Sequence, residues 1–174
     1  SCDLLMGISK QTVNINKLVL KGKEKNRLFR YVPHGKNPDI YFPIPEDDPD
    51  YIRAKKSLFP KRDPKFVVYF NSRNIRRKQI PDTMLAFRAF LDSLPKEEAK
   101  DCHLILKTEG VTEPGTDLLK VKEYIFDESY FENVHFIFNK LNEVQLNHLY
   151  NLADVQILLT SNEGWGLANT EAIL

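Results

Sequence analysis

The chain has 174 residues, of which 42% are apolar and 28% charged, and its 25 basic and 24 acidic side chains give a net charge of +1. These values are typical of a globular domain with a buried core, and they exclude collagen-like, disulfide-scaffold and fully disordered chains. The apolar runs reach only about five residues, against the roughly 20 that a membrane-spanning helix needs. No transmembrane segment is therefore predicted.

The first 40 residues predict two short strands and a helix, followed by a proline-rich segment. Apolar spacing indicates a strand over Leu4–Ser9, a helix over Gln11–Leu20 and a strand over Leu28–Val32. The proline-rich segment runs from Pro33 to Pro64. We interpret residues 1–40 as the end of an upstream domain with its hinge, and residues 41–65 as a linker.

From Phe66 onward, short β-branched or aromatic runs alternate with segments of helical apolar spacing. The strands are expected over Phe66–Phe70, His103–Lys107, Val134–Phe138 and Val155–Leu159, and the helices over Pro81–Leu94, Leu118–Phe131, the segment that Asn142 caps with Gln145, and a last one from near Gly166. This alternation predicts an α/β fold, a Rossmann-like parallel sheet flanked by helices. Because no strand follows the last helix, we expect the 66–174 domain to be incomplete at its C-terminus.

Two loops of this domain carry candidate chemistry. The first follows the Phe66 strand and has four bases in six residues, Arg73, Arg76, Arg77 and Lys78, at the entrance to a helix. A helix N-terminus already attracts anions, so bases placed there favour phosphate binding. The bases between Arg53 and Lys65 are read differently, as a solvated face.

The second loop, from Thr160 to Glu171, places two glycines around the only tryptophan, Trp165. Glycine lets a backbone approach a ligand closely, and the carboxylates of Glu163 and Glu171 can accept from the hydroxyls of a sugar. Two alternatives stay open here. The two glutamates could be ordinary surface and helix acids, and Trp165 could belong to a core.

Three motifs in order resemble those of retaining glycosyltransferases with the GT-B fold. Glu163 and Glu171, with seven residues between them, resemble the E-x7-E motif of that family. Arg73 and Lys78 are similar to its Arg/Lys pair, and the Val32–Gly35 segment is similar to its hinge. The sequence departs from the family pattern where Ser72 and Gln79 replace frequent glycines and His34 replaces a common asparagine.

The resemblance implies a role for each matched residue. Arg73 and Lys78 would neutralise the donor diphosphate, Glu163 would contact the transferred sugar, and Glu171 would hold the ribose hydroxyls. The backbone of Gly164, Trp165 and Gly166 would lie against the sugar, the amides of Leu167 and Ala168 would meet phosphate, and Asn139, Lys140 and Leu141 would line the base pocket. In this family the leaving phosphate is thought to assist the acceptor, so no protein nucleophile is required.

The expected function is sugar transfer from a UDP-sugar or GDP-sugar, with retention of configuration, this chain supplying the donor-binding half. The acceptor, the base and the sugar are not encoded in any motif, and the chain is expected to be inactive alone. No cofactor or metal is expected, since neither the histidines nor Cys2 and Cys102 have metal-site spacing. A cytoplasmic location is expected, with peripheral membrane attachment of a full-length enzyme left open.

Two other functions compete with this one. The first is a catalytically inactive nucleotide- or sugar-binding module with the same residues. The second is a nucleic-acid binder that uses the ten bases between Arg53 and Lys78. Against the second, no aromatic residues are interleaved with those bases as stacking platforms, so no nucleic-acid partner is expected.

Overall fold

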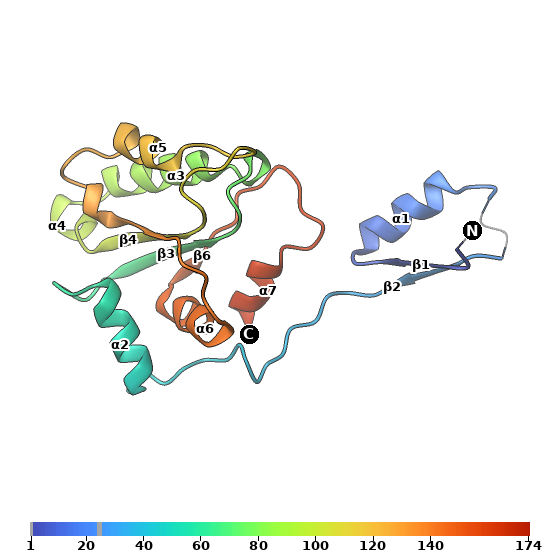
Figure 1. Ribbon diagram of the computed structural model, residues 1–174, viewed down its shortest axis with the longest axis horizontal. Coiled ribbons are helices and arrows are strands. Elements are labelled where there is room, and N and C mark those ends of the chain that lie inside the picture. Colours follow the sequence, from blue (N-terminus) through green and yellow to red (C-terminus); the bar gives the residue numbers. More distant parts are fainter. Residues whose placement is uncertain (1, 24–25) are drawn as a thin grey trace. The chain divides into compact units, whose positions relative to one another are not determined.

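The computed structural model of the protein describes residues 2–23 and 26–174. They divide into two compact units. The first unit comprises the chain up to Lys36 together with Glu163–Leu167, and the second comprises Asn37–Asn162 and Ala168–Leu174. Figure 1 shows the elements of both.

The first unit is built on a strand–helix–strand segment. Strands β1 (Leu4–Gly7) and β2 (Leu28–Tyr31) pair in parallel, with Leu4 opposite Leu28, and helix α1 (Lys10–Val19) connects them. The helix begins because the Ser9 hydroxyl accepts a hydrogen bond from the Thr12 amide at 3.0 Å. A Cβ on Gly7 would come within 2.7 Å of the Val13 side chain, so glycine allows the helix to pack closely on the strand. All three predicted elements are present.

The second unit contains a parallel sheet in the order β5-β4-β3-β6. Its strands are β3 (Phe66–Asn71), β4 (Cys102–Lys107), β5 (Val134–Ile137) and β6 (Val155–Gln156). In β3, Val68 and Phe70 belong to one core cluster, whereas Val67 and Tyr69 belong to the other. A strand covered on both faces reads as a continuous apolar run, as Phe66–Phe70 does. The predicted α/β fold class is confirmed.

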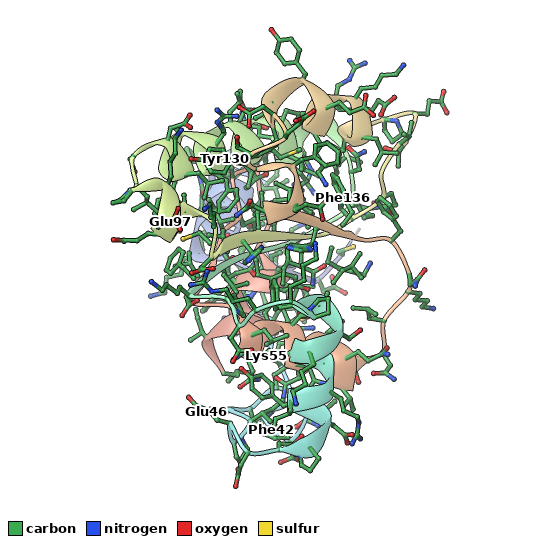
Figure 2. All side chains as sticks on the ribbon, turned by 90° about the vertical axis from the view of Figure 1, so that its left-hand side faces the viewer. Phe42, Glu46, Lys55, Glu97, Tyr130 and Phe136 are labelled. Atoms are coloured by element: carbon green, nitrogen blue, oxygen red, sulfur yellow. The ribbon has the colours of Figure 1, made fainter. Side chains whose placement is uncertain are left out.

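Helices cover both faces of this sheet (Figure 1). One face carries α3 (Ile80–Asp92), α4 (Lys96–Ala99) and α5 (Leu118–Ile125), and the other carries α2 (Pro49–Leu58) and α6 (Glu143–Leu152). Figure 2 places Tyr130 toward the first of these faces, and Lys55 of α2 with the nearby Phe42 toward the second. The capping box predicted at Asn142 and Gln145 is present at the start of α6.

The segment predicted as a linker, residues 41–65, contains helix α2, which the sequence did not predict. Asp48 starts the helix by accepting hydrogen bonds from the amides of Asp50 and Tyr51, both at 2.9 Å, and Pro49 fits the first turn. The Tyr51 hydroxyl donates to the Asn151 carbonyl of α6 at 3.3 Å. The proline and charge content of this segment concealed a short helix that packs on the sheet.

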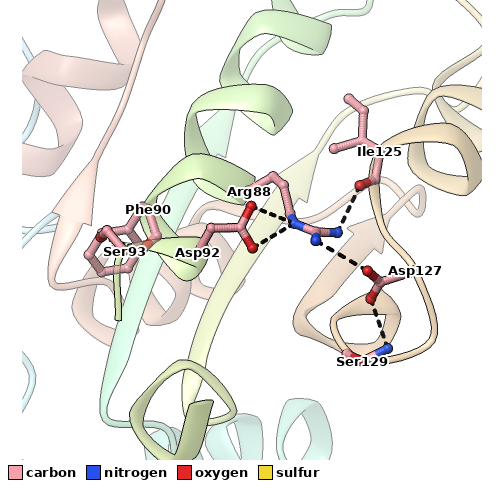
Figure 3. A network of polar contacts seen from close by, with 7 residues as sticks. All are labelled: Arg88, Phe90, Asp92, Ser93, Ile125, Asp127 and Ser129. Carbon is pink, nitrogen blue, oxygen red and sulfur yellow. Dashed lines mark hydrogen bonds and ion pairs between the residues drawn. The ribbon is translucent and has the colours of Figure 1, made fainter. Parts of the chain in front are cut away.

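Helix α5 ends at Ile125, six residues before the predicted end at Phe131. Arg88 of α3 donates to the Ile125 carbonyl at 3.1 Å and pairs with Asp127 at 3.1 Å, at the point where the helix ends (Figure 3). The Asp127 carboxylate also accepts from the Ser129 amide at 3.0 Å, which folds the chain into a turn. Phe131 lies instead in the short 3-10 helix η2 (Phe131–Asn133).

Strand β6 is shorter than the predicted Val155–Leu159. Only Val155 and Gln156 pair with β3, opposite Val68 and Tyr69, and the Ile157 amide adds one more bond to the Tyr69 carbonyl at 2.9 Å. Ile157 and Leu158 then pack against the first core cluster. Strand β5 likewise ends at Ile137, one residue early.

Candidate functional site

The basic loop leaves the carboxyl end of the central strand β3. Arg73, Arg76 and Arg77 are exposed, whereas Lys78 is 8% exposed. Residues Arg76–Lys78 form the 3-10 helix η1, and the chain enters α3 through Gln79, whose φ of 44° lies in the left-handed region. Gln79 occupies a position where the family that the sequence resembles often has glycine. Glycine adopts this conformation without strain.

Asn74 anchors this loop to the loop that follows β4. The Asn74 side chain, 3% exposed, donates to the Thr116 carbonyl at 2.6 Å and accepts from the Thr116 amide at 3.1 Å. Its own amide donates to Glu109 at 2.8 Å, and its carbonyl accepts from the Thr112 hydroxyl at 2.5 Å. The backbone next to Arg73 is therefore held by four hydrogen bonds to the loop that follows β4.

Arg77 joins the basic loop to the segment after β6. Its carbonyl accepts from the Ser161 amide at 2.9 Å and from the Thr160 hydroxyl at 3.1 Å, and its guanidinium donates to the Asn162 carbonyl at 2.5 Å. The segments that follow β3 and β6 are neighbours because the two strands pair in parallel. Sequence reasoning grouped Arg77 with the phosphate-binding bases, whereas here its side chain contacts backbone.

Glu171 lies on α7 (Leu167–Ile173), the helix predicted to begin near Gly166. Its Oε2 accepts from the Tyr150 hydroxyl of α6 at 2.5 Å, and the Tyr150 oxygen accepts in turn from the Asn71 amide group at 3.0 Å. Burial, the charges of Glu171 and Glu143, and a hydrogen bond with Glu171 raise the pKa of Tyr41 to about 12. Two tyrosines therefore approach the Glu171 carboxylate, and Asn71 places it close to the carboxyl end of β3.

The predicted base-pocket residues follow β5. Asn139 and Lys140 are exposed, and Leu141 packs against the second core cluster. Parallel strands direct their carboxyl ends to one edge of the sheet, so this segment, the basic loop and Asn71 share that edge.

The remaining candidates, Glu163–Leu167, belong to the first unit. The Trp165 ring lies edge-on to His34, with centroids 6.2 Å apart and an interplanar angle of 76°. Gly166 has a φ of 85°, and a Cβ on Gly164 would lie 3.1 Å from the Ile8 side chain. Both glycines therefore meet a backbone or packing requirement inside this unit, and Ala168 begins the part of α7 that belongs to the second.

Sequence reasoning missed the polar partners of this region. The sequence places Asn71 at the start of the loop after the Phe66 strand, Tyr41 in the linker and Tyr150 on the inward face of a helix. In the structure, Tyr150 and Tyr41 bind the Glu171 carboxylate, and Asn71 reaches it through Tyr150. A signal did exist for Tyr150: a tyrosine on the buried face of a helix needs a partner for its hydroxyl. The identity of that partner depends on tertiary contacts.

The described residues contain neither a metal-binding cluster nor a membrane-spanning helix. Over residues 2–23 and 26–174, no cluster of three or more His, Cys, Asp and Glu side chains is arranged to hold a metal ion. Within the same ranges, every helix is too short or too polar to cross a bilayer.

Comparison with known proteins gives a match at the level of structure. No family model matches the chain, and no curated protein matches it in sequence. An E. coli trehalose-6-phosphate structure with bound UDP-2-fluoro glucose has a TM-score of 0.71 and 15% identity, covering 98% of this chain and 43% of that one. The glycosyltransferase WaaG, involved in lipopolysaccharide biosynthesis, has a TM-score of 0.69 and 19% identity, covering 97% of this chain and 41% of that one.

A third structure is the C-terminal domain of the group 1 glycosyl transferase LpcC from Francisella tularensis. It has a TM-score of 0.61 and 17% identity, covering 80% of this chain and 66% of that one. The chain thus spans about two-fifths of the length of the first two proteins. At these identities the matches establish only the fold, which has parallel α/β sheets flanked by helices and corresponds to part of GT-B glycosyltransferases.

Proposed function

We propose that this chain is the donor-binding half of a retaining glycosyltransferase that uses a nucleotide-diphosphate sugar. The proposal rests on one observation in the second unit. At the carboxyl ends of the strands, a firmly anchored basic loop and a glutamate held by tyrosine both lie close to the end of β3. Open α/β sheets bind ligands at this edge. The shared fold with a protein that binds UDP-2-fluoro glucose supports a UDP-sugar as the donor, and GDP-sugars remain candidates.

The proposed roles follow the chemistry of each group. Arg73 and Lys78 neutralise the diphosphate and the charge that develops as it leaves, a task for fixed cations near a helix start. Glu163 contacts sugar hydroxyls, Glu171 holds the ribose, and the backbones of 139–141 and 164–168 line the base, sugar and phosphate. No metal is assigned to the reaction.

The proposal divides the chain into three parts. Residues 1–40 are the end of an acceptor domain with its hinge, and 66–174 are the donor domain. Residues 41–65 connect them and contribute α2 to the donor side. Transfer to an acceptor is proposed for an enzyme that contains this half, and donor binding for the chain itself.

Calorimetric titration with UDP, GDP and ADP tests the site. We expect one diphosphate to bind, and Arg73→Ala and Glu171→Ala each to weaken it roughly tenfold or more, as loss of a charge-assisted hydrogen bond does. Arg53→Ala is the matched control, because Arg53 is an exposed base of α2 that pairs with Asp50. Equal binding by all four proteins would refute the assignment.

Salt dependence separates this function from nucleic-acid binding. A pocket for one diphosphate should lose affinity only modestly as salt rises, whereas a surface that contacts many phosphates loses it steeply. A steep slope with single-stranded oligonucleotides, together with no diphosphate binding, would favour the nucleic-acid alternative. Diphosphate binding without sugar transfer by an enzyme that contains both halves would favour the inactive binding module.

A further inference from the structure

Two tyrosines from distant parts of the chain hold the carboxylate of Glu171. Tyr150, on α6, donates its hydroxyl proton to Glu171 Oε2 at 2.5 Å. Tyr41, from the segment before α2, makes a hydrogen bond with the same carboxylate. A carboxylate can accept about four hydrogen bonds, so two tyrosine hydroxyls do not exhaust its capacity.

The direction of the hydrogen bonds around Tyr150 is determined by its partners. The side-chain NH2 group of Asn71 can only donate, and it does so to the Tyr150 oxygen at 3.0 Å. The single proton of Tyr150 is thereby left to Glu171. Burial and the hydrogen bond to Glu171 raise the pKa of Tyr150 far above its usual value, so this hydroxyl stays a donor.

Packing fixes the position of this hydroxyl. Tyr150 is 8% exposed, and its ring lies edge-on to Tyr69 at 5.2 Å and to Tyr41 at 5.9 Å between centroids. Asn71 is the last residue of β3, one of the two inner strands of the sheet. The orientation of Glu171 is therefore coupled, through Tyr150 and Asn71, to the end of β3, a strand that is paired on both sides.

We propose that Tyr150, assisted by Tyr41, is a positioning residue that orients the Glu171 carboxylate to accept the vicinal hydroxyls of a ribose. This inference rests on the proposed function, because the diol belongs to the nucleoside diphosphate. A glutamate held in one rotamer loses no side-chain freedom when the ligand binds, so pre-orientation favours the ribose over an analogue that lacks a hydroxyl. Tyr150 and Tyr41 thus contribute to sugar recognition without contacting the nucleotide.

The chain provides a matched control at Tyr69. Its hydroxyl is buried and has no hydrogen-bond partner, and its ring packs on Tyr150. Tyr69→Phe removes the same atom as Tyr150→Phe from the same cluster, but it removes no hydrogen bond from the Glu171 carboxylate. Any general loosening of the aromatic cluster should appear in both variants.

The test compares UDP, GDP and ADP with their 2′-deoxy counterparts by calorimetry on the full chain. For the diphosphate that binds, we expect a ribose preference in the wild type and in Tyr69→Phe. Tyr150→Phe should lower the affinity for the ribose form about three- to tenfold and leave that for the deoxy form nearly unchanged. Glu171→Gln should abolish the preference. An unchanged preference in Tyr150→Phe would overturn the inference.

A second measurement separates this inference from the proposed function. The ¹³C signal of the Glu171 carboxyl should shift in Tyr150→Phe and shift much less in Tyr69→Phe, with no nucleotide added. If the Glu171 signal does not shift in Tyr150→Phe, the positioning role is overturned even if nucleotide binds. If none of the three diphosphates binds, the proposed function and the ribose role fall together, whatever this signal shows.

Discussion

Gln79 adopts a backbone conformation that suits glycine. Its φ of 44° places it in the left-handed region, at the junction of η1 and α3. A Cβ in this region costs roughly 1–2 kcal/mol, so Gln79→Gly should raise the free energy of unfolding by about 1 kcal/mol after the entropy cost of glycine is deducted. Urea denaturation measures the change. Gln79→Ala keeps the Cβ and should give no gain; an equal gain in both variants would contradict the strain argument.

Asn74 is the residue on which the basic loop depends. Replacing it with alanine leaves the amide and the carbonyl of Thr116 without their buried partner. We expect Asn74→Ala to lower the free energy of unfolding by about 2–4 kcal/mol, the cost of unsatisfied buried groups. Arg76→Ala, which alters an exposed side chain of the same loop, should stay within about 0.5 kcal/mol. Comparable losses in the two variants would show that the Asn74 contacts are not the anchor.

Single residues mark the limit of prediction from this sequence. The charges of Arg73 and Lys78 and the glycines around Trp165 could be recognised because local composition and spacing carry that information. Asn74 could not, because its partners lie 35 to 42 residues away in the chain. The same holds for Tyr150 and Asn71, which are 79 residues apart and meet only through the fold.

At the scale of elements, Arg88 joins two helices that are not consecutive. Its guanidinium contacts Asp92 of α3, the Ile125 carbonyl at the end of α5, and Asp127 (Figure 3). Arg88→Ala should lower the free energy of unfolding by about 1–3 kcal/mol, because charge-assisted bonds to a half-buried donor are lost. The control is Arg53→Ala, whose ion pair with Asp50 is largely exposed and should contribute under about 0.5 kcal/mol. Thermal and urea unfolding of both variants checks the difference.

The same contacts explain which elements could be predicted. Strand β3 and helices α3 and α6 have strong periodicity or a capping box, and their positions agree with the sequence within a few residues. The apolar periodicity continues beyond helix α5, whose last carbonyl, that of Ile125, accepts a hydrogen bond from Arg88 of another helix. Helix α2 has little apolar pattern; it begins at the Asp48 cap, and its Tyr51 hydroxyl contacts Asn151 of α6.

At the scale of the molecule, the α/β class could be predicted because buried parallel strands are nearly continuous apolar runs. The strand order β5-β4-β3-β6 could not, because nothing local to β6 directs it to the far side of β3. That order is what brings Thr160–Asn162 to Arg77 and the segment carrying Glu171 to the end of β3. The site therefore depends on topology more than on any single motif.

A histidine pair makes the stability of the second unit depend on pH. His103 Nδ1 and His135 Nε2 are 3.0 Å apart, next to the Phe59 ring, so one nitrogen must donate and the other accept. Burial lowers the pKa of both; the pKa of His135 falls to about 4, helped by His103 and Lys122, while Asp101 opposes the shift at His103. The folded state therefore binds protons less readily than the unfolded chain, whose histidines titrate near 6.5.

This contribution to stability is complete above pH 6.5 and is lost as the pH falls toward 4. Between pH 7 and pH 5 we expect the pair to account for a loss of up to about 2 kcal/mol in the free energy of unfolding. His135→Gln keeps an amide near the Nε2 position and does not titrate, so its unfolding free energy should fall less over the same interval. Urea titrations at pH 7, 6 and 5 measure both proteins. If the unfolding free energies of the two proteins fall equally between pH 7 and pH 5, the acid sensitivity comes from carboxylates elsewhere and not from the histidine pair.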